Sequence, residues 1–144
     1  MFSITFTDSQ EIHDEVTYQV GRIIAGSLNE SFRSALDYLS VDQYRKQWMQ
    51  ALDDLINGAS RSALITCFEK PEINGALDWW PLYLEGKIVS VRYQLLVLGS
   101  LKRPFDLDRF QEFVPPHKQC NEDGYQISEW SVSIQEIIDF RRNH

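Results

Sequence analysis

The sequence has few of the residues that hold small cross-linked or metal-bound proteins together. Of its 144 residues, two are cysteine and three are histidine. Cys67 and Cys120 cannot form a disulfide-rich scaffold, and a structural zinc site needs four cysteine or histidine ligands. We therefore expect a reduced protein with no bound metal and no other cofactor.

Long apolar stretches are also missing from the chain. The longest apolar runs, such as residues 95–98, are far below the roughly 18 residues that a membrane span needs. Residues 1–10 have neither the basic nor the apolar section of a signal peptide. We expect a soluble, cytoplasmic protein that does not bind membranes.

Basic residues are in deficit, because 14 Lys and Arg stand against 21 Asp and Glu, for a net charge of −7. Negative charge repels phosphate backbones and anionic lipids, so direct binding to nucleic acid or to a membrane surface is disfavoured. The same charge permits a basic protein partner that is attracted over long range. The charge alone does not select such a partner.

Apolar and aromatic residues are plentiful, at 43% and 12% of the chain, which is enough to bury a core. Glycine and proline are scattered, and no repeat or linker interrupts the sequence. This organisation predicts a single domain over residues 1–144.

The N-terminal half combines strand patterns with one clear helix. Alternating apolar and polar residues predict a strand over 1–7, and residues 16–34 favour one long, bent strand that pairs with it. A helix is predicted over 41–57, because Ser40 and Gln43 can form a capping box at its start.

Further strands follow the helix. Residues 62–68 are apolar on both faces, which is typical of a central strand. Residues 76–85 and 87–98 are predicted to form a tight hairpin, with Pro81 placing the first strand at an edge or a bulge. On 87–98 the alternation assigns one face to Val89, Val91, Tyr93, Leu95 and Val97.

The C-terminal part adds shorter elements. Asp106 and Ser133 can cap two short helices, and a strand is predicted between them. These elements span residues 107–113, 125–132 and 134 onward. The whole pattern predicts an α+β fold, with a largely antiparallel sheet packed against two or three helices.

No group of residues stands out as a catalytic site. Cys67 lies in an apolar strand, where a buried thiol stays unreactive. His117 and Cys120 are three residues apart in a stretch that resembles a surface loop, and Asp53 and Asp54 point about 100° apart on a helix. We therefore predict that the protein is not an enzyme.

The best candidate for a partner-binding surface is the stretch from 69 to 85, where acidic residues surround two consecutive tryptophans. Neighbouring strand residues face opposite sides of a sheet, so one tryptophan is either covered or open to a partner. The alternative is an ordinary solvated loop and strand edge. The candidate partner-binding residues are Glu69, Glu72, Asp78, Trp79, Trp80 and Glu85.

Short runs across residues 37–140 resemble bacterial immunity proteins of contact-dependent growth inhibition systems. The runs that carry the resemblance are DQYRKQW at 42–48, ALDDLING at 51–58, SALIT at 62–66, WPLY at 80–83 with Gly86, PF at 104–105, DG at 123–124 and ISEW at 127–130.

The resemblance implies a cytosolic antitoxin that binds, one to one, the C-terminal toxin domain of a cell-surface effector. Many of these toxins are nucleases, whose basic groove would attract an acidic inhibitor. The family pattern contains no catalytic residues. Two alternatives remain: a small ligand-binding or adaptor domain, and a small cysteine-dependent enzyme that uses Cys67 and His117.

Overall fold

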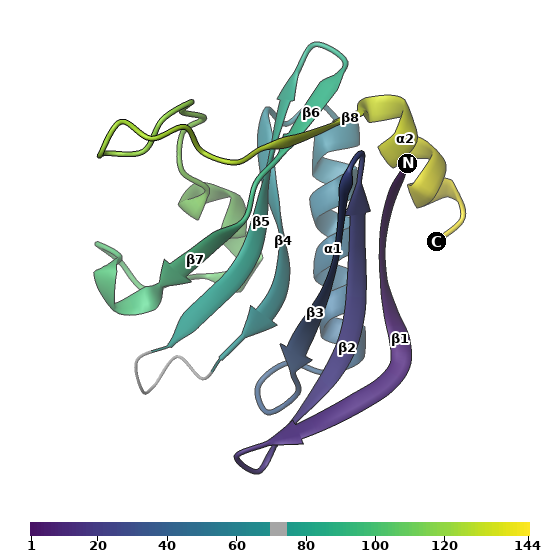
Figure 1. Cartoon of the computed structure of the whole chain (residues 1–144), viewed down its shortest axis with the longest axis vertical. Helices are drawn as coiled ribbons and strands as arrows, with labels where there is room; N and C mark the ends of the chain where they lie inside the picture. The colour runs from purple at the N-terminus through teal and green to yellow at the C-terminus, as the bar shows by residue number, and fades with distance from the viewer. Residues whose placement is uncertain (70–74) are drawn as a thin grey trace.

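The chain forms two antiparallel sheets, two α-helices and two short 3-10 helices within residues 1–69 and 75–144, which the computed structural model describes. Figure 1 shows the two sheets on either side of a long helix. This arrangement confirms the predicted α+β class. None of the helices in the described ranges combines the length and apolar character needed to cross a membrane.

The first sheet is a three-stranded meander in the order β1-β2-β3. Its strands are β1 (Phe2–His13), β2 (Val16–Ala25) and β3 (Leu28–Ala35). The prediction of one long strand over 16–34 was wrong, because Gly26 turns the chain back with a φ of +63°. A side chain at Gly26 would also meet the Ser131 carbonyl oxygen, 2.7 Å from the position of its Cβ.

The second sheet has five strands in the order β4-β5-β6-β8, with β7 also paired to β5. Its strands are β4 (Arg61–Phe68), β5 (Ala76–Glu85), β6 (Ile88–Val91), β7 (Gln94–Val97) and β8 (Trp130–Ser133). The predicted hairpin between β5 and β6 is confirmed, with Gly86 in the left-handed conformation. The strand predicted over 125–132 is shorter and begins at Trp130.

Two predicted strand positions in this sheet were wrong. β4 lies at one end of the strand order and not at its centre, although all but its first residue are buried. Its outer side faces β3, where the Ser34 hydroxyl donates a hydrogen bond to the Thr66 carbonyl oxygen. β5, which contains Pro81, is not an edge strand, because it pairs with β4 on one side and with β6 and β7 on the other.

The strand predicted over 87–98 is broken at Arg92 and Tyr93 into β6 and β7. Pro81 has no N–H, and its carbonyl oxygen accepts a hydrogen bond from Arg92 N at this break. The register with β5 is the same on both sides of the break, because Leu82 stands opposite Val91 and Trp79 opposite Gln94, so the predicted common face exists but is covered only in its β6 half. Val89 and Val91 are buried, whereas Leu95 and Val97 are exposed.

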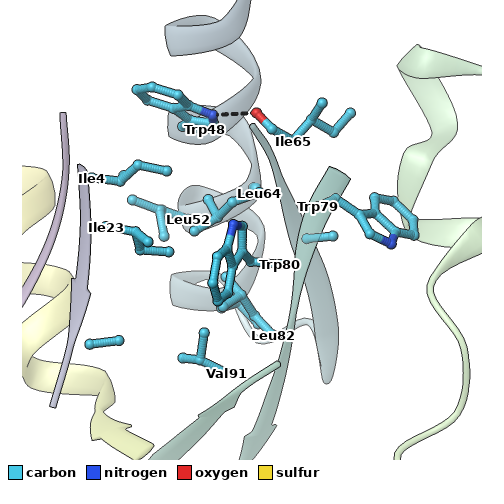
Figure 2. Close-up of a cluster of buried hydrophobic side chains, with 14 of the residues drawn as sticks. Ile4, Ile23, Trp48, Leu52, Leu64, Ile65, Trp79, Trp80, Leu82 and Val91 are labelled. Atoms are coloured by element: carbon cyan, nitrogen blue, oxygen red, sulfur yellow. Dashed lines mark hydrogen bonds between the residues drawn. The ribbon is translucent and has the colours of Figure 1, made fainter. Parts of the chain in front are cut away.

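Helix α1 (Val41–Ile56) joins the two sheets. Its capping box between Ser40 and Gln43 is present, as predicted. Trp48 contacts the first sheet through Phe6, with ring centroids 4.7 Å apart, and donates from Nε1 to the Ile65 carbonyl oxygen of the second sheet at 2.7 Å (Figure 2). The core therefore lies between the sheets and the helix.

The remaining helices are short and follow β7 and β8 in the chain. The 3-10 helices η1 (Leu98–Ser100) and η2 (Leu107–Phe113) follow β7, and helix α2 (Ile134–Arg142) follows β8 with its predicted capping box. α2 packs near β1 and α1, where Arg141 pairs with Asp53 at 2.8 Å.

Candidate interaction surface

The three acidic residues predicted to bind a partner that the structure describes do not form one cluster. Glu69 is exposed just beyond β4, Asp78 is half-buried in β5, and Glu85 is exposed at the other end of β5. Asp78 and Glu85 are seven positions apart along an extended strand, a distance of roughly 23 Å. Glu72 lies outside the described residues.

The two tryptophans predicted for the same surface are buried, with Trp79 0% and Trp80 4% exposed. They point to opposite faces of β5 (Figure 2). Trp79 packs against Phe105 and donates from Nε1 to Gln94 Oε1, and Trp80 lies between Tyr93 and Trp130. Because both faces are covered here, neither ring is available as an exposed anchor for a partner.

Asp78 faces a groove of about 310 Å³ between the two sheets. Its carboxylate accepts a hydrogen bond from the Tyr93 hydroxyl. Partial burial and this hydrogen bond raise the pKa of Tyr93, so the phenol remains a donor at neutral pH. The groove is lined by Glu30, Ser31, Phe32, Arg33, Thr66, Cys67, Asp78, Trp80 and Tyr93.

A second acidic surface lies at the tip of the β1–β2 hairpin and was not predicted. Residues 8–15 hold four acidic side chains and no Lys or Arg. Ile12 is 71% exposed at the same tip. A strand was predicted only over residues 1–7. The four acidic residues among the next eight could have indicated this surface. The four acidic residues are Asp8, Glu11, Asp14 and Glu15.

Cys67 is a core residue, as predicted. Its side chain is buried in β4, and burial raises the pKa of the thiol to about 12. A thiol of that pKa supplies almost no thiolate at neutral pH. The helix carboxylates are also engaged, because Asp53 pairs with Arg141, and Asp54 accepts hydrogen bonds from Gln50 and Gln111.

His117 lies between two carboxylates on opposite sides of its ring. Nδ1 is 3.0 Å from Glu85 Oε1, and Nε2 is 2.9 Å from Glu129 Oε2. The imidazole stacks on Tyr83 with centroids 4.5 Å apart. Carboxylates on opposite sides cannot converge on one ion, and no group of three or more His, Cys, Asp or Glu could hold a metal within residues 1–69 and 75–144.

Glu129 completes this ionic cluster through Arg92, whose Nε donates to Glu129 Oε2 at 2.7 Å. Burial opposes ionisation of Glu129, but hydrogen bonds from His117, Arg92 and Ser90 outweigh it and lower the pKa of the carboxyl. Through Glu129, these interactions connect the segment before β8 to Arg92, at the break between β6 and β7. The role of the cluster is therefore structural.

A cavity of about 360 Å³ lies beside this cluster, under the segment that leads to β8. Tyr83, Arg92 and Ile127 are among its lining residues. Its size suits a small ligand, but the described residues around it include no group that distinguishes one ligand class from another.

Comparisons with known proteins agree on one family. Residues 34–140 match the model of the CdiI N-terminal domain. The chain is 25% identical over 122 residues to the immunity protein CdiI of Enterobacter cloacae subsp. cloacae. This alignment covers 85% of this chain and 83% of that protein. A chain of the CdiA-CT/CdiI toxin and immunity complex from Enterobacter cloacae shares the fold, with a TM-score of 0.89, 23% identity, and coverage of 99% and 97%.

Proposed function

The chain belongs to the CdiI N-terminal domain family, and from this membership we propose that it binds and neutralises the toxin domain of a contact-dependent growth inhibition effector. The match over residues 34–140 is the observation that carries the proposal. It is supported by the similarity to the immunity protein CdiI, which spans most of both proteins. Immunity proteins are not enzymes, so the activity to be explained is binding.

We further propose that the toxin is a basic nuclease, bound one to one in the cytoplasm. The net charge of −7 supports this, because a nuclease presents a positive groove to the phosphates of its substrate. An acidic inhibitor is attracted to such a groove and associates quickly with it.

We propose that the contact involves the acidic residues Glu69, Glu72, Asp78 and Glu85. Asp78 supports this placement, because its half-buried carboxylate faces the groove between the sheets. A Lys or Arg of the toxin that entered this groove would gain a partly desolvated ion pair. Trp79 and Trp80 are buried on opposite faces of β5 (Figure 2) and contribute to packing.

The test is to mix the purified protein with the purified toxin domain encoded by the neighbouring gene. Calorimetry is expected to give one binding site per chain, and the protein is expected to block cleavage of nucleic acid by the toxin. A toxin domain from a different system is the control and should remain active. Absence of both binding and protection would contradict the proposed function, whereas protection from a toxin that cleaves no nucleic acid would contradict only the nuclease proposal.

The placement of the contact can be tested by charge reversal. In the double variant Glu69→Lys/Glu72→Lys, the association rate at low salt should fall about tenfold and depend less on salt, because steering is weakened. The matched control is Asp8→Lys/Glu15→Lys, which makes the same charge change at the hairpin tip. Stopped-flow association measures both, and a larger loss in the control would move the contact to the tip.

A further inference from the structure

Strand β7 has one side that no other strand covers in the described part of the chain. It pairs only with β5, whereas β6 pairs with β5 and β8. Backbone groups alternate in direction along an antiparallel strand. Leu98 N donates to the Gly75 carbonyl oxygen at 3.0 Å. The backbone N–H and C=O of Leu96, two residues earlier, therefore also point toward β5, whereas the backbone groups of Leu95 and Val97 point away from it.

The groups that point away are free to bind another strand. Within residues 1–69 and 75–144, no hydrogen bond reaches the N–H or C=O of Leu95 or the N–H of Val97. The Val97 carbonyl oxygen accepts one hydrogen bond from Ser100 Oγ at 2.7 Å. The side chains of Leu95 and Val97 are 55% and 47% exposed. An apolar edge with open backbone groups is a template for pairing with another chain.

The other half of the same broken strand shows how such an edge is completed. Val89 and Val91 of β6 face β8, where they stand opposite Val132 and Trp130. Both valines are fully buried. On the β6 half, the distant strand β8 is therefore added antiparallel to the sheet. No strand of the described residues takes the same position beside β7.

The charges around β7 determine what kind of segment would fit. Asp78 stands opposite Leu95, and Glu69 is hydrogen-bonded to Ala76, which stands opposite Val97. A second copy of this chain would bring the same carboxylates together and would add another charge of −7. An extended segment that carries Lys or Arg beside its apolar side chains avoids this repulsion.

We propose that β7 is the docking edge for the toxin, which adds one extended, basic segment to the second sheet. The inference rests on the proposed function, because the toxin supplies the segment. The added strand bonds to the backbone groups of Leu95 and the N–H of Val97. Its apolar side chains cover Leu95 and Val97, and a basic side chain beside Leu95 extends toward Asp78, which stands opposite Leu95.

Amide hydrogen exchange, followed by NMR with and without the toxin domain, tests the proposal. In the free protein the amides of Leu95 and Val97 should exchange at least about a hundredfold faster than that of Leu96, which points toward β5. In the complex, the Leu95 and Val97 amides should slow by a similar factor. If the toxin binds and both amides continue to exchange rapidly, the docking edge is wrong while the proposed function stands.

A pair of variants at one position separates the backbone from the side chain. Leu95→Pro removes the outward N–H without removing a bond to β5, whereas Leu95→Thr keeps the N–H and changes only the side chain. Toxin affinity should fall at least tenfold more in Leu95→Pro than in Leu95→Thr. Equal affinities of two folded variants would overturn the proposal, and the exchange measurement decides it alone if Leu95→Pro does not fold.

Two further outcomes are informative. Failure of the wild-type protein to bind the toxin at all would remove the proposed function and this inference together. Protection of the Leu95 amide that rises with the concentration of the free protein would assign the edge to a second copy of the chain and overturn the proposal.

Discussion

β6 and β7 are halves of one strand that lie on the same side of β5, yet they differ in what lies beyond them. Both are four residues long and rich in apolar side chains. β8 covers β6, and Val89 and Val91 are buried, whereas Leu95 and Val97 of β7 remain about half exposed. Burial in this sheet therefore depends on what packs against a residue and not on its apolar character, since Val91 lies with Leu82 in the buried cluster (Figure 2).

The break between β6 and β7 is explained by a proline on the neighbouring strand. Pro81 of β5 cannot donate to the strand opposite it, so the ladder is interrupted at Arg92 and Tyr93. Arg92 is buried at the break and is neutralised by Glu129. The register with β5 is the same on both sides of the interruption, so Leu95 and Val97 stand on the same face of the sheet as Val89 and Val91.

The largest effect on stability is expected from a charge introduced into β6, the half that β8 covers. Val91→Asp should lower the free energy of unfolding by about 4 kcal/mol or more, because it buries a carboxylate without a partner. Leu95→Asp, the matched change on the open half, should stay within about 0.5 kcal/mol. Urea unfolding followed by circular dichroism measures both, and similar losses in the two variants would show that β7 is covered in solution.

A smaller effect is expected at the break itself. Glu129→Gln should cost about 1–2 kcal/mol at pH 7, because Arg92 and His117 lose an ionised acceptor. The matched control Glu85→Gln removes the more exposed partner of His117 and should cost less.

The pH dependence of this effect has a definite sign. The folded state lowers the pKa of Glu129, so its stabilisation is present above the unfolded value near 4.5 and is lost as the pH falls through the lower folded value. The difference between wild type and Glu129→Gln should therefore shrink below about pH 4.5. A difference that stays constant from pH 7 to pH 3 would show that the ionic cluster does not hold the break.

Much of the fold followed from local patterns. The capping residues Ser40 and Ser133 marked both α-helices, and the hairpin at Gly86 followed from turn chemistry. The split of residues 16–34 was missed, because Gly21 and Gly26 both interrupt the pattern and only Gly26, with a φ of +63°, turns the chain. The break at Arg92 was missed because it depends on Pro81 across the sheet.

The candidate site was predicted less well than the fold. The burial of Cys67 could be predicted, because its own strand is apolar on both sides. The exposure of a tryptophan could not be, because Trp79 and Trp80 are covered by Phe105 and Trp130 from distant parts of the chain. The proposed edge at β7 was not visible either, because no local pattern states which strand lacks a neighbour.

Local and compositional patterns were sufficient to predict the α+β class, the two capped helices, the acidic charge and the family. These properties depend on composition and on residues close together in the chain, or on runs that can be matched directly. Which apolar residues are buried and which strand edge is open depends on contacts between distant parts of the chain. Leu95 and Val97 are as apolar as Val89 and Val91 and stand on the same face of the sheet, but only Val89 and Val91 pack into the core and have β8 beside them.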